Sequence, residues 1–127
     1  MLRIEDKVLH PELSYIVCGI CFETHNELGR FRNEQQYADA VEYKLKARSI
    51  PCIREWRVPG SFQGERSGRN IVDFIIDGKI VLELKAKQIL TKDDYFQIKR
   101  YLISCDKQLG ILVNFHQKVL TPKRVLN

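Results

Sequence analysis

Two carboxylates and a lysine lie near the middle of the chain, in two segments whose β-branched residues are typical of strands. Asp73 falls in the segment Ile71–Ile76, and Glu83 and Lys85 fall in residues 80–86. Carboxylate oxygens bind hard cations such as Mg²⁺ or Mn²⁺, which can activate water and neutralise charge on a phosphodiester. An ammonium group beside them can stabilise the same developing charge. The three side chains are therefore a candidate metal-dependent site, provided that they share one face of a sheet.

The turn between the two strands decides whether they do. Six apolar residues need a common buried face: Val72, Phe74, Ile76, Ile80, Leu82 and Leu84. A two-residue turn at Asp77 and Gly78 would separate them, whereas a three-residue loop that starts at Ile76, with Gly78 left-handed, brings them together. The same shift puts the three charged side chains on the opposite face, with Glu83 diagonal to Asp73. The alternative is an exposed sheet face that carries one ordinary salt bridge.

Two helices precede this hairpin. Residues Pro11–Leu28 carry an apolar stripe at steps of three and four, with proline in the first turn and a glycine after the last. Residues 33–48 form a second predicted helix, for which Asn33 is the N-cap. A strand at 52–58 and a polar, glycine-containing loop at 61–68 lead into the hairpin.

One more helix and two more strands follow. The helix starts after Thr91, with Asp94 completing a capping box, and ends near Ser104. Residues 109–115 form a buried strand, and residues 118–126 form an edge strand because Pro122 suits an edge. The order predicts an α/β fold, a mixed β-sheet flanked by helices.

The length and charge of the chain set broad limits. Its 127 residues are expected to form one domain, residues 1–127, and a net charge of +5 favours polyanionic partners. No apolar run is long enough to span a membrane, and residues 1–6 lack the apolar core of a secretory signal. We therefore expect a cytoplasmic protein without membrane contact.

Cysteines suggest a second metal hypothesis. Cys18, Cys21 and His25 lie on one flank of the first predicted helix. Structural zinc sites usually draw on two short ligand clusters, and no second cluster follows. We therefore favour partly buried helix cysteines over a zinc site.

The central hairpin resembles a known signature. Asp73, nine residues and then Glu83-Leu84-Lys85 resemble the motif of the PD-(D/E)XK nuclease superfamily. The chain also resembles the small bacterial and archaeal proteins of the GxxExxY family, over about residues 12–124. The matching segments are FETHNELG at 22–29, Glu34 and Tyr37, VDFIIDGKIVLELKA at 72–86, Gln97 with Tyr101-Leu102, and GILVNF at 110–115.

The resemblance implies a restriction-endonuclease-like (PD-(D/E)XK) core and a nuclease that uses Mg²⁺ or Mn²⁺. Asp73 and Glu83 would bind the metal, with Glu34 as an additional acid, and Lys85 would be the catalytic lysine. Gln97 would orient Lys85 or bound water. From the residues alone, Glu34 could instead be a favourable charge at a helix N-terminus and Gln97 a solvated helix residue.

Two residues depart from the family pattern. Phe31 replaces the first glycine of the GxxExxY motif, so the loop before Glu34 needs another backbone if that glycine has a positive φ. Ile71 stands where a basic or polar residue is expected, which removes one phosphate contact.

Basic residues near the proposed site suit contacts with the backbone of a nucleic acid, and the alternative for any one of them is an ordinary solvated surface residue. They are Arg30, Arg32, Lys87, Lys99 and Arg100. DNA is the favoured substrate and RNA the alternative. No base-reading helix or aromatic stacking motif is evident, so a second copy or another protein could supply specificity. A non-catalytic nucleic-acid-binding domain and a protein-interaction module stay open.

Overall fold

The computed structural model describes residues 9–66 and 68–127; the prediction for residues 1–6 lies outside them. The described elements, in chain order, are α2 (Pro11–Leu28), α3 (Glu34–Ala47), β1 (Cys52–Arg57), β2 (Ile71–Ile76), β3 (Ile80–Lys85), α4 (Lys92–Cys105), β4 (Leu109–Asn114) and β5 (Lys123–Leu126). Each has the predicted type. The clearest difference is β5, which starts only after Pro122, because residues 115–122 form turns and irregular backbone.

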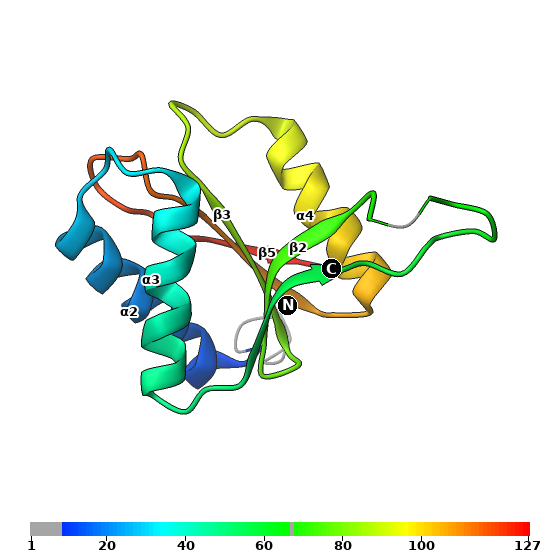
Figure 1. Ribbon diagram of the computed structural model, residues 1–127, viewed down its shortest axis with the longest axis horizontal. Coiled ribbons are helices and arrows are strands. Elements are labelled where there is room, and N and C mark those ends of the chain that lie inside the picture. Colours follow the sequence, from blue (N-terminus) through cyan, green and yellow to red (C-terminus); the bar gives the residue numbers. More distant parts are fainter. Residues whose placement is uncertain (1–8, 67) are drawn as a thin grey trace, which may run out of the picture.

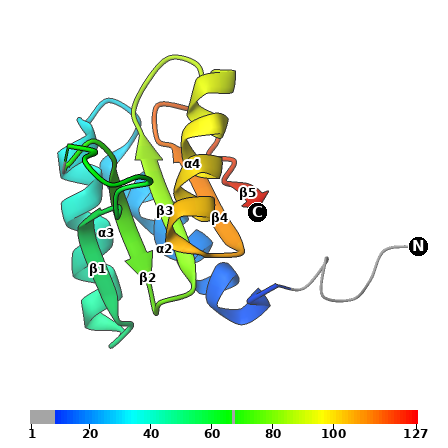
Figure 2. The same cartoon turned by 90° about the vertical axis from the view of Figure 1, so that its right-hand side faces the viewer.

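The described strands form one mixed sheet in the order β1-β2-β3-β4-β5. β3 and β4 are parallel, and the other neighbours are antiparallel. Helices α2 and α3 lie on one face and α4 on the other, as Figures 1 and 2 show. The predicted α/β fold is thereby confirmed. No helix among the described residues is long and apolar enough to cross a membrane.

Each face of the sheet has its own core. Val17 and Ile20 of α2 and Tyr37 of α3 pack with Phe74 and Leu82 in the first. The second forms between α4 and the opposite face of the sheet. Its members are Val58, Val72, Ile75, Val81, Ile98, Tyr101, Leu102, Leu112 and Val125. The central strands are therefore covered on both sides.

The hairpin loop has the predicted length but a different position. Ile76 pairs with Ile80, so the loop consists of Asp77, Gly78 and Lys79. Asp77 and Gly78 both have positive φ, 51° and 64°, and the N–H of Lys79 donates to the carbonyl of Ile76 at 2.9 Å. Aspartate tolerates this conformation, which lets two buried isoleucines pair inside the sheet. The one-residue shift of the loop keeps the predicted faces, because it changes the pairing by two positions.

Two details of the predicted pairing are wrong. Continued from Ile76–Ile80, the register places Glu83 opposite Asp73 rather than diagonal to it. Val72 is buried on the α4 side rather than with Phe74. The β1–β2 ladder skips Asp73 and its neighbour Glu55, whose φ is 55°, and this interruption ends the simple alternation.

A close approach between α4 and β4 gives a stability prediction. A Cβ atom at Gly110 would lie 2.7 Å from Cδ1 of Ile98. We expect Gly110→Ala to lower the free energy of unfolding by about 1–3 kcal/mol, measured in urea, because the packed core must shift. Gly19→Ala in α2 is the control, since nothing lies within 4 Å of its added Cβ. It should be neutral or stabilising by up to about 1 kcal/mol. Equal destabilisation by both would contradict this account of the contact.

Candidate active site

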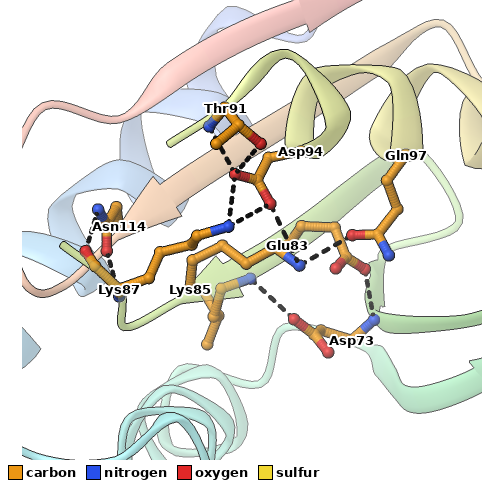
Figure 3. A network of polar contacts seen from close by, with 9 residues as sticks. Asp73, Glu83, Lys85, Lys87, Thr91, Asp94, Gln97 and Asn114 are labelled. Carbon is orange, nitrogen blue, oxygen red and sulfur yellow. Dashed lines mark hydrogen bonds and ion pairs between the residues drawn. The ribbon is translucent and has the colours of Figure 1, made fainter. Parts of the chain in front are cut away.

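Strands β2 and β3 stop pairing where the two acidic residues begin. The last paired residues are Phe74 and Leu82. Beyond them the carboxylates bridge the strands: Glu83 Oε1 accepts from the N–H of Asp73 at 2.8 Å, and Asp73 Oδ2 accepts from the N–H of Leu84 at 2.8 Å (Figure 3). The reciprocal bonds fix both carboxylates between the strands and engage one oxygen of each.

Burial makes this acidic pair hard to ionise. Glu83 is 3% exposed, and Asp73 is half-buried. Burial raises the pKa of Glu83 well above its ordinary value, and the negative charge of Asp73 adds to the rise. Burial also raises the pKa of Asp73, against the opposing effects of the Leu84 N–H and the Lys85 ammonium. Such a pair is stabilised by a proton or by a bound cation.

Lys85 is held beside the acidic pair by α4. Its Nζ donates to Gln97 Oε1 at 2.9 Å and lies 3.9 Å from Asp94 Oδ1, as Figure 3 shows. The structure thus brings Gln97 into direct contact with Lys85. The roles of these residues in chemistry stay predictions.

Asp94 has a larger part in this site than the sequence indicated. Its side chain is buried and accepts from the N–H of Thr91 at 2.7 Å and from Lys87 Nζ at 3.0 and 3.2 Å. Burial alone would raise the pKa of Asp94, but the Thr91 N–H and the Lys87 ammonium lower it. The sequence showed only a capping box. The spacing of Lys85 and Lys87 on one side of an extended chain was the available signal for a shared acidic partner.

Asn114 joins the ends of β3 and β4. It is 2% exposed, its Oδ1 accepts from the N–H of Lys87 at 3.1 Å and of His116 at 3.3 Å, and its Nδ2 donates to the carbonyl of Lys87 at 2.8 Å. Sequence reasoning gave it no role. An asparagine in an otherwise apolar buried strand was the signal, since a buried amide needs partners.

Glu34 begins α3, and the residue as a whole is exposed although its carboxylate is partly covered. Partial burial of its carboxylate raises its pKa, the charge of Asp73 adds to the rise, and the Lys85 ammonium opposes it. Glu34 is therefore within electrostatic reach of the site. Even so, residues 9–66 and 68–127 contain no group of three or more His, Cys, Asp or Glu side chains arranged to hold a metal. Glu34 approaches the acidic pair without completing a three-ligand set.

The loop before Glu34 accommodates Phe31 without strain. Among the described residues of this loop, Gly29 has the positive φ, 77°, and Phe31 does not. The Tyr37 hydroxyl donates to the carbonyl of Gly29 at 2.5 Å and accepts from the N–H of Arg32 at 3.2 Å. These two hydrogen bonds of Tyr37 fix the backbone of the loop at Gly29 and Arg32. Ile71 is exposed in β2, and its apolar side chain brings no charge to that position.

Three of the five predicted basic residues lie at the site end of the sheet. Arg30 and Arg32 are in the loop before Glu34, and Lys87 directly follows β3. Arg30 Nε donates to the carbonyl of His116 at 2.8 Å, whereas the Lys87 ammonium is paired with Asp94. Contact with a substrate through Lys87 would therefore compete with this ion pair.

The other two basic residues lie along α4. Lys99 Nζ donates to the carbonyl of Leu126 at 2.6 Å, so it is engaged with β5, which β4 separates from β3. Arg100 is exposed. The structure does not bring Lys99 to the acidic pair.

The cysteines of α2 are packed helix residues. Cys21 is buried in the first core and Cys18 is half-buried. Burial raises the pKa of the Cys21 thiol, which disfavours the thiolate that zinc requires. His25 Nε2 lies 2.8 Å from the carbonyl of Gln117.

The raised pKa of Glu83 gives a prediction for the metal-free protein in EDTA. The folded state holds this proton more tightly than the unfolded chain, so folding loses stability as the pH rises above about 4.3, the ordinary glutamate value. We expect the free energy of unfolding of the wild type to fall with pH relative to that of Glu83→Gln. The measurement is chemical denaturation across a pH series.

Glu42 is the control of opposite sign. Burial would raise its pKa, but contacts with Arg54 and Lys46 lower it, so its stabilising contribution is present above the ordinary glutamate pKa and is lost as the pH falls. The wild type should therefore gain stability with pH relative to Glu42→Gln. Parallel pH curves for the wild type and Glu83→Gln would show that Glu83 is not perturbed.

Comparison with known proteins supports the family suggested by the hairpin. A family model described as the PD-(D/E)XK nuclease superfamily matches residues 11–125. Searches of curated proteins and of solved structures found no match. The matched region contains strands β1 to β4, most of β5, the acidic pair and Lys85. This chain belongs to the PD-(D/E)XK nuclease superfamily.

Proposed function

We propose that this chain is a divalent-metal-dependent nuclease that hydrolyses phosphodiester bonds, with DNA as the favoured substrate and RNA as the alternative. One observation carries the proposal: Asp73 and Glu83 meet where two strands separate, and Lys85 is held beside them. Superfamily membership supports the same reaction class.

The donor set fits Mg²⁺ or Mn²⁺. Asp73 and Glu83 offer oxygen ligands, and the bonds to backbone N–H groups engage only one oxygen of each. Their raised pKa values mean that a nearby dication would relieve an unfavourable charge. Asp73 and Glu83 would hold the ion, with Glu34 as a further acid at longer reach. When bound, such an ion supplies activation of water and neutralisation of phosphate charge.

Lys85 and Gln97 supply the rest of the proposed site. An ammonium has three N–H donors, and Gln97 accepts one of them. The others remain to bind a phosphate oxygen and stabilise the charge that develops on it. Gln97 would keep the Lys85 side chain in that position.

We propose finer assignments as well. Glu34 and Tyr37, together with the hairpin, support placement in the GxxExxY family. We also propose one domain over residues 1–127 and a cytoplasmic location. The basic loop that contains Arg30 and Arg32 would contact the backbone of the nucleic acid.

Isosteric variants test the metal site. Asp73→Asn and Glu83→Gln retain an oxygen that can accept the backbone bonds but lose the charge, so Mn²⁺ binding by calorimetry and cleavage of DNA and RNA should both be lost. Lys85→Ala should bind Mn²⁺ while its cleavage rate falls about a hundredfold or more. Asp77→Asn, in the turn at the other end of the hairpin, is the matched control and should behave like wild type.

The outcomes separate the alternatives. Cleavage that persists in Asp73→Asn, or a wild type that binds no Mn²⁺, would refute the proposed mechanism. Binding of Mn²⁺ and nucleic acid without cleavage of any substrate would favour a non-catalytic nucleic-acid-binding domain.

A further inference from the structure

An exposed aromatic side chain lies at the site end of the sheet. Phe31, in the loop between α2 and α3, is 80% exposed. It lies three residues before Glu34, whose carboxylate is within electrostatic reach of Asp73 and Lys85. Figures 1 and 2 show this loop at the same end of the sheet as the segment that follows β3. Phe31 therefore lies at the end of the sheet that carries the proposed reaction centre.

His116 links Phe31 to the ends of the central strands. Their rings meet edge to face, with centroids 5.8 Å apart and an interplanar angle of 77°. His116 directly follows Phe115, whose N–H donates to the carbonyl of Lys85 at 2.8 Å, and its own N–H donates to Asn114 Oδ1 at 3.3 Å. The position of Phe31 is thus tied to the backbone that carries Lys85.

Arg30 adds a positive charge to this aromatic pair. Its guanidinium carbon lies 5.1 Å from the centroid of the Phe31 ring, and its Nε donates to the carbonyl of His116 at 2.8 Å. The hydrogen bond holds the guanidinium against the ring. An aromatic ring stacks on any nucleobase, and a neighbouring arginine attracts both the base and its phosphate.

Core packing does not account for Phe31, because a side chain this exposed buries little apolar surface. Its contacts hold the ring in place and leave most of it in solvent. Tyr15 on α2 is 81% exposed and provides a comparison, since it has a similar exposure on a different element.

We propose that Phe31, supported by Arg30 and His116, is a stacking platform for an unpaired nucleobase, and that the substrate is single-stranded or locally unpaired nucleic acid. This inference rests on the proposed function and adds the structural class of its substrate. Bases inside a duplex are stacked on their neighbours, so the ring can engage only a base that has left the stack. The sequence showed no stacking motif because Phe31 and His116 meet only in the fold.

Binding in EDTA tests the platform without any requirement for cleavage. Fluorescence anisotropy would measure the affinity for a short labelled oligothymidylate, for the same oligonucleotide with one abasic site moved along it, and for a duplex. We expect Phe31→Ala to weaken single-strand binding about tenfold. An abasic site at the contacted position should weaken wild-type binding by a similar factor and should add little in Phe31→Ala.

Two variants complete the design. Phe31→Trp should keep wild-type affinity, and Tyr15→Ala should leave binding unchanged. Equal losses on duplex and single strand, no coupling between Phe31→Ala and any abasic site, an equal loss in Tyr15→Ala, or no binding of nucleic acid would each overturn the platform. If Phe31→Ala and an abasic site are coupled but no divalent metal supports cleavage, the platform stands and the nuclease proposal fails.

Discussion

The reciprocal hydrogen bonds between the Asp73 and Glu83 segments are the constraint on which the rest of the site depends. Where backbone pairing between β2 and β3 ends, the carboxylates accept from backbone N–H groups of the opposite strand. This arrangement keeps the strands together and places two acidic groups side by side in a poorly solvated position. The raised pKa values are the electrostatic consequence, and they make the pair a place where a cation is favourable.

Helix α4 organises the opposite charge. Gln97 and Asp94 approach Lys85 from the same helix, and Asp94 also holds Lys87. The site therefore has an acidic half on β2 and β3 and a basic half that α4 supports. A metal ion suits the acidic half, and a phosphate oxygen suits the basic half. The proposed hydrolysis requires both of these interactions.

The sequence predicted what depends on local pattern and missed what depends on distant contacts. Alternation and loop length predicted that Asp73 and Glu83 come together, and hydrogen bonds between their segments confirm this. They did not predict the interruption at Asp73 that turns Val72 to the α4 side, or the left-handed conformation of Asp77 that shifts the register by two positions. The hydrogen bonds of Asn114 could not be predicted, because they form where β3 and β4 end together. The contact of Phe31 with the segment after β4 likewise requires the folded chain.

Anomalous X-ray scattering from crystals grown with Mn²⁺ would test most directly whether the acidic pair holds a cation. We expect one peak within about 2.0–2.6 Å of a carboxylate oxygen of Asp73 and one of Glu83, and no such peak in Glu83→Gln crystals. A wild-type crystal in which Mn²⁺ binds elsewhere, with no peak between these two carboxylates, would contradict the central role assigned to the pair.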